Sequence, residues 1–312
     1  MLSNSYSEGK ENWRDNVFKN ISTGTNEQLY FRQFLASQDF SPHTVKAMIF
    51  DIRKFALYFT VVNKEPFDCS RITTMDMTNF KRYLREEKKQ AVSTVNRAIV
   101  SIRRYLDRLV EQGILKVNTG KVVKELKRQQ LVPKGLDRGQ VRKLLREVDL
   151  RNDVRGKAIF SMFLQSGCRV SDLVKIELHD LIISDRTGSV VFRNGKGNKE
   201  RQVPLTLECR KYLQEYLSIR PPVNNKKLFI GERGALTDVG IRNLCNKYSC
   251  ICGFKIYPHL LRHSFSLQFL KDTNNDLVAL AQILGHENLN TTKIYSQKNN
   301  SDLAEIVEKL SY

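Results

Sequence analysis

Apolar residues recur every three or four positions along four segments of the first 115 residues, the spacing of one buried helix face. The segments are Asn26–Ser37, Ser41–Phe59, Thr74–Lys88 and Ser93–Gln112. Ser41 can cap the second helix, and Pro42 suits its first turn because an N–H there has no helical partner to lose. Gly113 suits the left-handed residue that follows a helix. We therefore expect a compact module of four helices.

The pattern after residue 136 predicts further helices around a small β-hairpin. The hairpin pairs residues 189–193 with 200–204, and its glycine-rich tip contains Gly195-Lys196-Gly197. A short strand is expected at Lys227–Ile230. The expected helices are Asp137–Glu147, Asp153–Gln165, Thr206–Ser218, Thr237–Ser249, Pro258–Lys271, Asp276–Leu284 and Asn290–Tyr295. The fold class is therefore mainly α with a small β-hairpin or sheet.

The segments between and beyond these modules differ in composition. Residues 1–24 are polar and predict a flexible arm. Residues 116–136 are basic and end in helix-breaking Pro133 and Gly135, as expected of a linker. The expected boundaries are an arm at 1–24, a helical domain at 25–115, a basic linker at 116–136, a mixed α+β domain at 137–300 and an amphipathic C-terminal helix at 301–312.

Positive charge is spread over both halves of the chain. The 312 residues include 52 Lys and Arg against 33 Asp and Glu, a net charge of +19. Such a surface suits a long polyanion gripped by both domains, although it could also serve solubility alone. No run of 18 apolar residues occurs, and the first residues are polar rather than signal-like. We expect a soluble, cytoplasmic protein with no membrane partner.

The chemistry-bearing residues give little sign of a metal or cofactor. Three cysteines lie close together in the C-terminal third: Cys245, Cys250 and Cys252. Their spacing is not that of a standard zinc site, and they are expected to be small buried hydrophobes. The other cysteines suit a reducing compartment rather than a disulfide framework. The sequence has no carboxylate cluster for two-metal catalysis and no phosphate-binding loop of the Gly-x-x-x-x-Gly-Lys type. We expect no cofactor.

A different set of residues suits phosphodiester chemistry. Arginine matches two phosphate oxygens and keeps its charge, imidazole and ammonium groups move protons, and a phenol can attack phosphorus. His259 and Arg262 are three positions apart, so they leave one helix face together. His286 follows Leu284-Gly285, where glycine can end a helix. The candidate catalytic residues are Arg169, Lys196, His259, Arg262, His286 and Tyr295.

The order and spacing of these residues resemble the tyrosine recombinase (integrase) family. The resemblance runs from about residue 25 to the C-terminus. It includes the eight residues from Ser166 to Leu173 around Arg169, the Gly195-Lys196-Gly197 turn, the His-x-x-Arg sequence and the nine-residue step from His286 to Tyr295. The family architecture pairs a helical core-binding domain with a C-terminal catalytic domain.

The resemblance implies a role for each candidate. Arg169 and Arg262 would clamp the scissile phosphate, and His286 would hydrogen-bond it. Tyr295 would form a 3′-phosphotyrosyl intermediate, which stores the bond energy so that no ATP is needed, and His259 would accept its proton. Lys196 would protonate the leaving 5′ oxygen, with Lys199 as the alternative.

Two neighbours of these candidates are expected to have other roles. Asp172 is expected to orient Arg169 or to cap a helix. His263 is adjacent to Arg262 and is expected to point elsewhere.

Basic residues on the third and fourth helices are candidates for DNA contact. The pattern places three arginines on one face of the fourth helix and a basic cluster at the end of the third. A solvated face is the alternative for each. The candidates are Lys81, Arg82, Arg85, Arg97, Arg104 and Arg108. The expected partners are double-stranded DNA with specific recombination sites and a homotetramer on two such sites, with a second recombinase or an accessory protein as further options.

Three functions fit the sequence unequally. The first is a site-specific recombinase that cleaves and rejoins DNA, either a mobile-element integrase or transposon resolvase or an Xer-like dimer resolvase. The second is a type IB topoisomerase-like relaxing enzyme, and the third is a DNA-binding protein with an inactive site. The complete set of six residues favours the first. The sequence leaves the target site and the choice among recombinase subtypes open.

Overall fold

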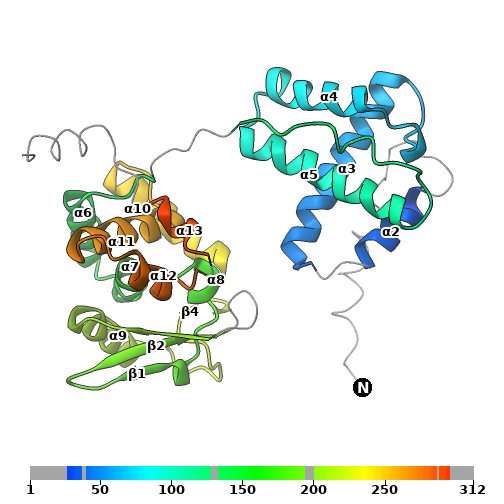
Figure 1. The fold of residues 1–312 in the computed structure, drawn as a ribbon. Helices are drawn as coiled ribbons and strands as arrows, with labels where there is room; N and C mark the ends of the chain where they lie inside the picture. The colour runs from blue at the N-terminus through cyan, green and yellow to red at the C-terminus, as the bar shows by residue number, and fades with distance from the viewer. Residues whose placement is uncertain (1–26, 37–39, 128–132, 194–199, 287, 296–312) are drawn as a thin grey trace, which may run out of the picture. The chain divides into compact units, whose positions relative to one another are not determined.

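The computed structural model describes residues 27–36, 40–127, 133–193, 200–286 and 288–295 (Figure 1). The chain divides into two compact units, Met1–Gln129 and Gln130–Tyr312. The fold class is confirmed: the described residues are mostly helical, with small antiparallel sheets in the second unit.

The first unit contains the four expected helices. Ser41 accepts a hydrogen bond from the N–H of Thr44 at the start of the second, and Thr73 forms a capping box with Asp76 at the start of the third. The third helix changes form at Tyr83, where the α-helix continues as a short π-helix. The elements are α2 (Glu27–Ala36), α3 (Pro42–Asn63), η1 (Cys69–Arg71), α4 (Thr74–Arg82), η2 (Tyr83–Glu87) and α5 (Val92–Glu111).

The core of the first unit extends beyond its helices. Edge-to-face aromatic pairs join Phe55 to Phe67 and to Phe80. Val123 is buried in the same core, and Asn96 exchanges two hydrogen bonds with the backbone of Leu126, at 2.8 and 2.9 Å. Residues 116–127 of the expected linker therefore belong to the folded first unit, because they supply apolar side chains and backbone partners to it.

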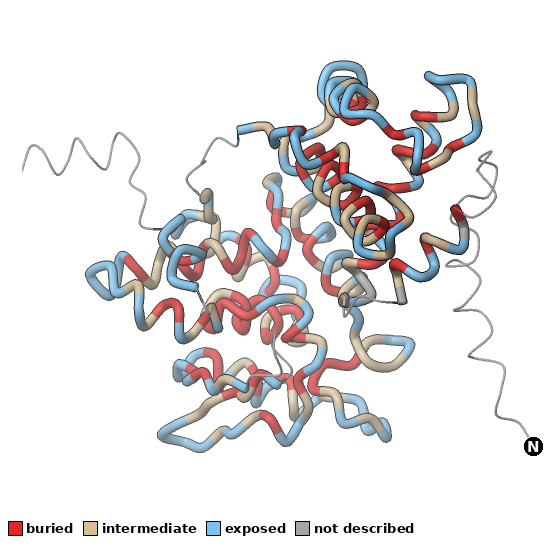
Figure 2. The backbone as a smooth tube through the Cα atoms, turned by 45° about the vertical axis from the view of Figure 1, so that its right-hand side comes forward, coloured by how far each residue is buried: buried red, intermediate tan, exposed pale blue. Residues whose placement is uncertain are grey.

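The second unit surrounds the buried helix α7. Its elements are α6 (Arg138–Asp149), α7 (Val154–Ser166), α8 (Val170–Leu173), η3 (Leu178–Asp180), β1 (Leu181–Ile183), β2 (Gly188–Phe192), β3 (Arg201–Pro204), α9 (Leu207–Ile219), β4 (Ile230–Gly231), β5 (Gly234–Ala235), α10 (Asp238–Cys252), α11 (Pro258–Asp272), α12 (Leu277–Leu284) and α13 (Asn290–Lys293). Ile159, Phe160 and Phe163 of α7 are fully buried. Figure 2 shows helices buried along their inner sides and exposed outside.

The expected hairpin is part of a three-stranded sheet. Val190 of β2 pairs with Val203 of β3 as predicted, and also with Leu181 of β1, a strand that the sequence pattern did not predict. The expected strand Lys227–Ile230 is mostly irregular: Ile230 lies in β4, and Lys227 forms an isolated bridge. Of the three cysteines of α10, Cys245 and Cys252 are buried as expected, but Cys250 is exposed because it faces away from the core.

Candidate active site

Helix α11 carries the centre of the site, and Arg262 is its most buried charge. The Arg262 side chain donates to the carbonyl oxygens of Gly167 at 2.5 Å and Leu284 at 3.2 Å, and to Nε2 of His286 at 2.8 Å. No carboxylate in the described part of the chain pairs with it. Burial lowers the pKa of Arg262 to about 10, so the guanidinium stays charged at neutral pH. One fixed cation therefore joins the ends of α7 and α12.

The turn after α7 requires glycine. Gly167 has a φ of +58°, and a Cβ at this position would lie 2.3 Å from Phe265 and 2.8 Å from Leu284. The chain can therefore reverse closely against α11 and α12. This turn leads directly to Arg169.

Arg169 is exposed at the start of α8, in contrast to Arg262. Burial is the main cause that lowers the pKa of Arg262 and that of His286, and the positive charge of Arg169 adds to it in both. The Arg169 side chain is therefore close enough to act on both groups. Asp172 accepts a hydrogen bond from the backbone N–H of Arg169 at 3.3 Å, as a helix cap would. Its ion-pair partner is Arg201, at 2.7 Å.

His286 is presented from the end of α12 as the sequence predicted, because Gly285 ends the helix with a φ of +65°. Burial, followed by Arg262, lowers the pKa of His286 to about 4, so the ring is neutral at pH 7. An arginine can only donate, hence Nε2 accepts from Arg262 and Nδ1 carries the hydrogen. Nδ1 lies 2.9 Å from Oγ1 of the buried Thr292, to which it donates.

His263 does not point away from the site, and that expectation was wrong. Its Nδ1 lies 2.9 Å from the hydroxyl of Tyr295, a residue only 6% exposed. The sequence signal was available: His263 follows His259 by four positions, so the two share a helix face. Their ring centroids are 4.2 Å apart.

His259 has an exposed side chain that is still partly shielded from water. This partial burial, followed by the charges of Arg262 and Arg169, lowers its pKa. It makes no hydrogen bond to Tyr295 among the contacts of the described residues. The structure thus brings Arg169, His259, Arg262, His286 and Tyr295 into one region, with His263 between His259 and the phenol.

Arg201 of β3 is a further member that the sequence gave no reason to select. Its Nε donates to the carbonyl of Ile283 at 3.1 Å, and its guanidinium lies 4.5 Å from the ring centroid of Phe192. Together with the pair to Asp172, these contacts attach the hairpin to α8 and α12. Nothing in the local pattern distinguishes Arg201 from other basic strand residues.

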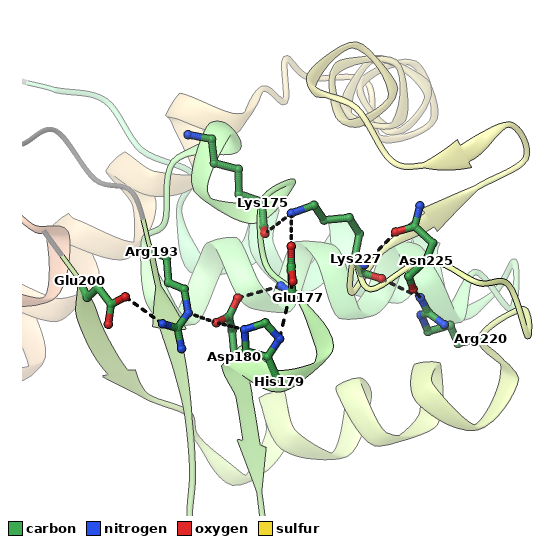
Figure 3. Close-up of polar contacts among 9 residues, drawn as sticks. All are labelled: Lys175, Glu177, His179, Asp180, Arg193, Glu200, Arg220, Asn225 and Lys227. Carbon is green, nitrogen blue, oxygen red and sulfur yellow. Dashed lines mark hydrogen bonds and ion pairs between the residues drawn. The ribbon is translucent and has the colours of Figure 1, made fainter. Parts of the chain in front are cut away.

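Lys196 and Lys199 lie outside the described residues, but the two ends of their segment are tied together. Arg193 at the end of β2 bonds to the buried Asp180 and to Glu200 before β3, the latter at 2.8 Å (Figure 3). Lys227 extends the network by pairing with Glu177 at 2.8 Å. The base of the hairpin is therefore held by ion pairs.

The candidate DNA-binding residues of the first unit are partly engaged within the protein. Arg97 makes a bidentate pair with the buried Asp51, at 2.9 and 3.0 Å. Arg108 pairs with Glu111 at 3.0 Å. Arg104 is exposed beside Phe40. The remaining three candidates lie on α4 and η2, and each donates a hydrogen bond within the first unit. Lys81 donates to the carbonyl of Lys124, Arg82 to the side chain of Asn79 and Arg85 to the carbonyl of Gln90.

Potential metal ligands come together at one place in the described chain, in the first unit and therefore far in sequence from Arg169 and Arg262. Glu27, Asp68 and Cys69 of the first unit lie close to one another, but Glu27 already accepts a 2.7 Å hydrogen bond from the N–H of Cys69. Within the same described ranges, no helix is both long and apolar enough to cross a membrane.

Comparison with known proteins identifies the family. Residues 134–302 match the phage integrase family, and residues 28–113 match the phage integrase N-terminal SAM-like domain. The chain belongs to the phage integrase family of tyrosine recombinases. It is 32% identical over 304 residues to tyrosine recombinase XerC of Thermodesulfovibrio yellowstonii, covering 91% of this chain and 97% of that protein. XerC of Haemophilus influenzae is 33% identical over 241 residues, 72% of this chain and 78% of the relative.

Solved recombinases share the fold. XerH bound to its difH substrate matches with a TM-score of 0.71 and 19% identity over 95% of this chain and 93% of the other. A lambda integrase dimer bound to a core site matches with a TM-score of 0.69 and 14% identity, over 86% and 93%. This recombinase is therefore an enzyme that cleaves and rejoins DNA at specific sites, and the comparisons favour neither the topoisomerase nor the inactive DNA-binding alternative.

Proposed function

We propose that Tyr295 is the nucleophile of the recombinase and forms a 3′-phosphotyrosyl link. The observation that carries this assignment is the position of its hydroxyl, 2.9 Å from an imidazole in a region where Arg169 and Arg262 supply positive charge. A phosphodiester placed there would have its developing negative charge stabilised by cations that are already in place.

The remaining candidates divide the chemistry among them. Arg169 and Arg262 hold the non-bridging oxygens. His259 is free to contact the phosphate, because it is exposed and uses none of its ring nitrogens within the described chain. His286 supplies a further hydrogen bond to the phosphate from Nε2 once that nitrogen leaves Arg262 and carries the ring hydrogen, with Nδ1 then accepting from the hydroxyl of Thr292. Lys196 protonates the leaving 5′ oxygen, with Lys199 as the alternative.

Replacing the phenol tests the nucleophile. Tyr295→Phe is expected to bind a suicide substrate with unchanged affinity and to form no covalent protein–DNA adduct on a denaturing gel. Tyr257→Phe is the matched control, since Tyr257 is exposed and lies before the His-x-x-Arg sequence; it should cleave at the normal rate. An adduct formed by Tyr295→Phe would disprove the assignment.

A substrate with sulfur in place of the leaving 5′ oxygen tests the general acid. A thiolate leaves without a proton, so Lys196→Ala should regain cleavage on this substrate while Arg169→Ala should not. Rescue of Lys199→Ala alone would assign the acid to Lys199.

Specific DNA binding is proposed to use both units. Lys81, Arg82, Arg85, Arg97, Arg104 and Arg108 contact DNA from the first unit. Arg104→Ala should reduce affinity and the salt dependence of binding, because it removes one phosphate contact. Equal salt slopes for the variant and the unchanged protein would remove Arg104 from the interface.

We further propose that four copies act on two DNA sites, with the segment 301–312 docking on a neighbouring copy. Truncation after Asn300 should leave single-site binding intact and weaken pairing of two sites in a gel-shift assay.

The biological setting is either movement of a mobile element, by integration or transposon resolution, or resolution of chromosome dimers. The relatives named XerC favour an Xer-like role, and the neighbouring genes would decide between the two settings.

A further inference from the structure

The phenol and His263 form a hydrogen-bonded pair inside the second unit. The Tyr295 hydroxyl lies 2.9 Å from Nδ1 of His263, and the two ring centroids are 5.4 Å apart. His259, the other imidazole of this helix face, contacts the ring of His263 instead. His263 therefore separates His259 from the nucleophile.

The direction of this hydrogen bond follows from charge and burial. Burial, followed by His259 and Arg262, lowers the pKa of His263 to about 4, so its ring is neutral at pH 7. A neutral imidazole has one nitrogen that accepts. If Nδ1 donated, the hydroxyl proton of the buried Tyr295 would have no acceptor among the described residues. Nδ1 therefore accepts, and the phenol donates.

We propose that His263, and not His259, accepts the proton of Tyr295 during attack on the scissile phosphate. This inference rests on the proposed function, namely that Tyr295 is the nucleophile. The O–H bond breaks and its proton moves to Nδ1 of His263, while the phenolic oxygen bonds to phosphorus. The bond from phosphorus to the 5′ oxygen breaks, and that oxygen takes a proton from the general acid. In rejoining, the imidazolium returns its proton to the phenol.

Substrate binding makes His263 a stronger base. The groups that face it are His259 and Arg262 from α11 and Tyr295 from the segment after α13. Arg262 disfavours the imidazolium in the free protein. A phosphate anion bound to Arg262 and Arg169 offsets that repulsion and raises the pKa of His263. Proton acceptance is thus linked to the presence of the scissile phosphate.

The two histidines form a matched pair for the test. His263→Gln and His259→Gln both keep a polar side chain but cannot accept a proton at neutral pH. Single-turnover cleavage of a suicide substrate is measured from pH 6 to 10, with DNA affinity and thermal unfolding as controls. His263→Gln should cleave about 100-fold or more slowly at pH 7. Its rate should rise about tenfold per pH unit. In this variant the phenol must lose its proton to solvent, and the phenolate fraction grows about tenfold with each unit of pH.

The control histidine should behave differently. His259→Gln is expected to lose cleavage by a factor that does not change with pH, since it binds phosphate and moves no proton. His263→Ala should regain cleavage when free imidazole is added, which a variant damaged only in packing would not do. This second variant also serves if His263→Gln folds poorly.

Three outcomes would overturn the assignment of His263. They are cleavage by His263→Gln within about threefold of the unchanged protein, an unchanged pH profile, and recovery at high pH in His259→Gln instead. Tyr295→Phe separates this failure from that of the proposed function. If Tyr295→Phe forms an adduct, the nucleophile is wrong; if it forms none while His263→Gln is normal, the proton acceptor alone is wrong.

Discussion

Two buried charges, Asp51 in the first unit and Arg262 in the second, are neutralised differently. In the first unit Asp51 is fully buried, and it receives two hydrogen bonds from Arg97 and a third, at 3.0 Å, from the hydroxyl of Ser101. In the second unit Arg262 is 2% exposed, and its partners are two backbone carbonyls and a neutral imidazole. The first buried charge is balanced by an opposite charge, and the second is balanced only by dipoles.

This difference separates a buried carboxylate that is already neutralised from a buried cation that is open to an anion. A buried carboxylate that has its own cation needs no further ligand. A buried guanidinium held by dipoles keeps its net positive charge, and its neighbours Arg169 and Arg201 add to it. An incoming phosphate supplies the missing negative charge. A buried arginine that has no carboxylate partner and lies near another cation therefore indicates a place where phosphate can bind.

The largest expected effect comes from Arg262. Arg262→Ala should reduce strand cleavage by about 100-fold or more, because a fixed donor to the transition state is lost. It should also lower the free energy of unfolding by about 3 kcal/mol, because two buried carbonyls lose their donor. Arg169→Ala should match the loss of cleavage but change stability by less than about 0.5 kcal/mol, since Arg169 is exposed. Urea unfolding and single-turnover cleavage measure the two quantities, and an equal loss of stability in both variants would contradict the comparison.

The pair in the first unit should show the opposite pattern. Arg97→Met should lower stability by about 3 kcal/mol, because it leaves Asp51 charged and buried without its cation. Asp51→Asn should cost about 1 kcal/mol, and the double variant should be more stable than Arg97→Met alone. Chemical denaturation provides the values. A double variant less stable than either single variant would show that the charge on Asp51 is not what makes Arg97 necessary.

Acid should have opposite effects on the two units. The pKa of His263 and that of His286 fall from 6.5 to about 4 on folding, so between these values the unfolded chain binds more protons. The second unit should therefore lose stability as the pH falls from about 6.5 to 4. Burial raises the pKa of Glu27 above 4.5, so its cost to the first unit is present at neutral pH and disappears on acidification.

Hydrogen exchange from pH 7 to 4.5, corrected for intrinsic rates, resolves the two units by peptide. Glu27→Gln should remove the gain of the first unit, since glutamine can accept from the N–H of Cys69 and donate to the hydroxyl of Tyr105. His286→Gln should reduce the loss of the second. Parallel behaviour of both units would show that these groups do not control acid stability.

Local signals explain what could be predicted of the fold. Ser41, Thr73 and Gly285 mark helix ends through their own chemistry, and the apolar periodicity between such ends needs no knowledge of tertiary structure. The π-turn at Tyr83, the strand β1 and the packing of residues 116–127 could not be predicted in this way. The packing of residues 116–127 depends on partners 30 positions away, as Asn96 is for Leu126, and β1, with 3 residues, is too short to show a period.

The candidate site divides along the same line. Arg169, His259, Arg262, His286 and Tyr295 could be selected because they occur in a recognisable order, although their roles stay predictions. Arg201 and Thr292 could not, because their importance comes from contacts to Asp172 and His286 that no local pattern contains. His263 could be selected from helical spacing, since it follows His259 by four positions on the same helix face.

The contacts of Arg262 also bear on the time at which the enzyme becomes able to cut DNA during its synthesis. Its guanidinium joins Gly167 to Leu284 and His286, which are synthesised much later than Gly167. Domains form in order as a chain leaves the ribosome, so the first unit can fold while the second is still being translated. A nascent chain that ends before Tyr295 can thus hold a folded first unit without the proposed nucleophile. Synthesis itself then delays cleavage until the chain as far as Tyr295 has been made.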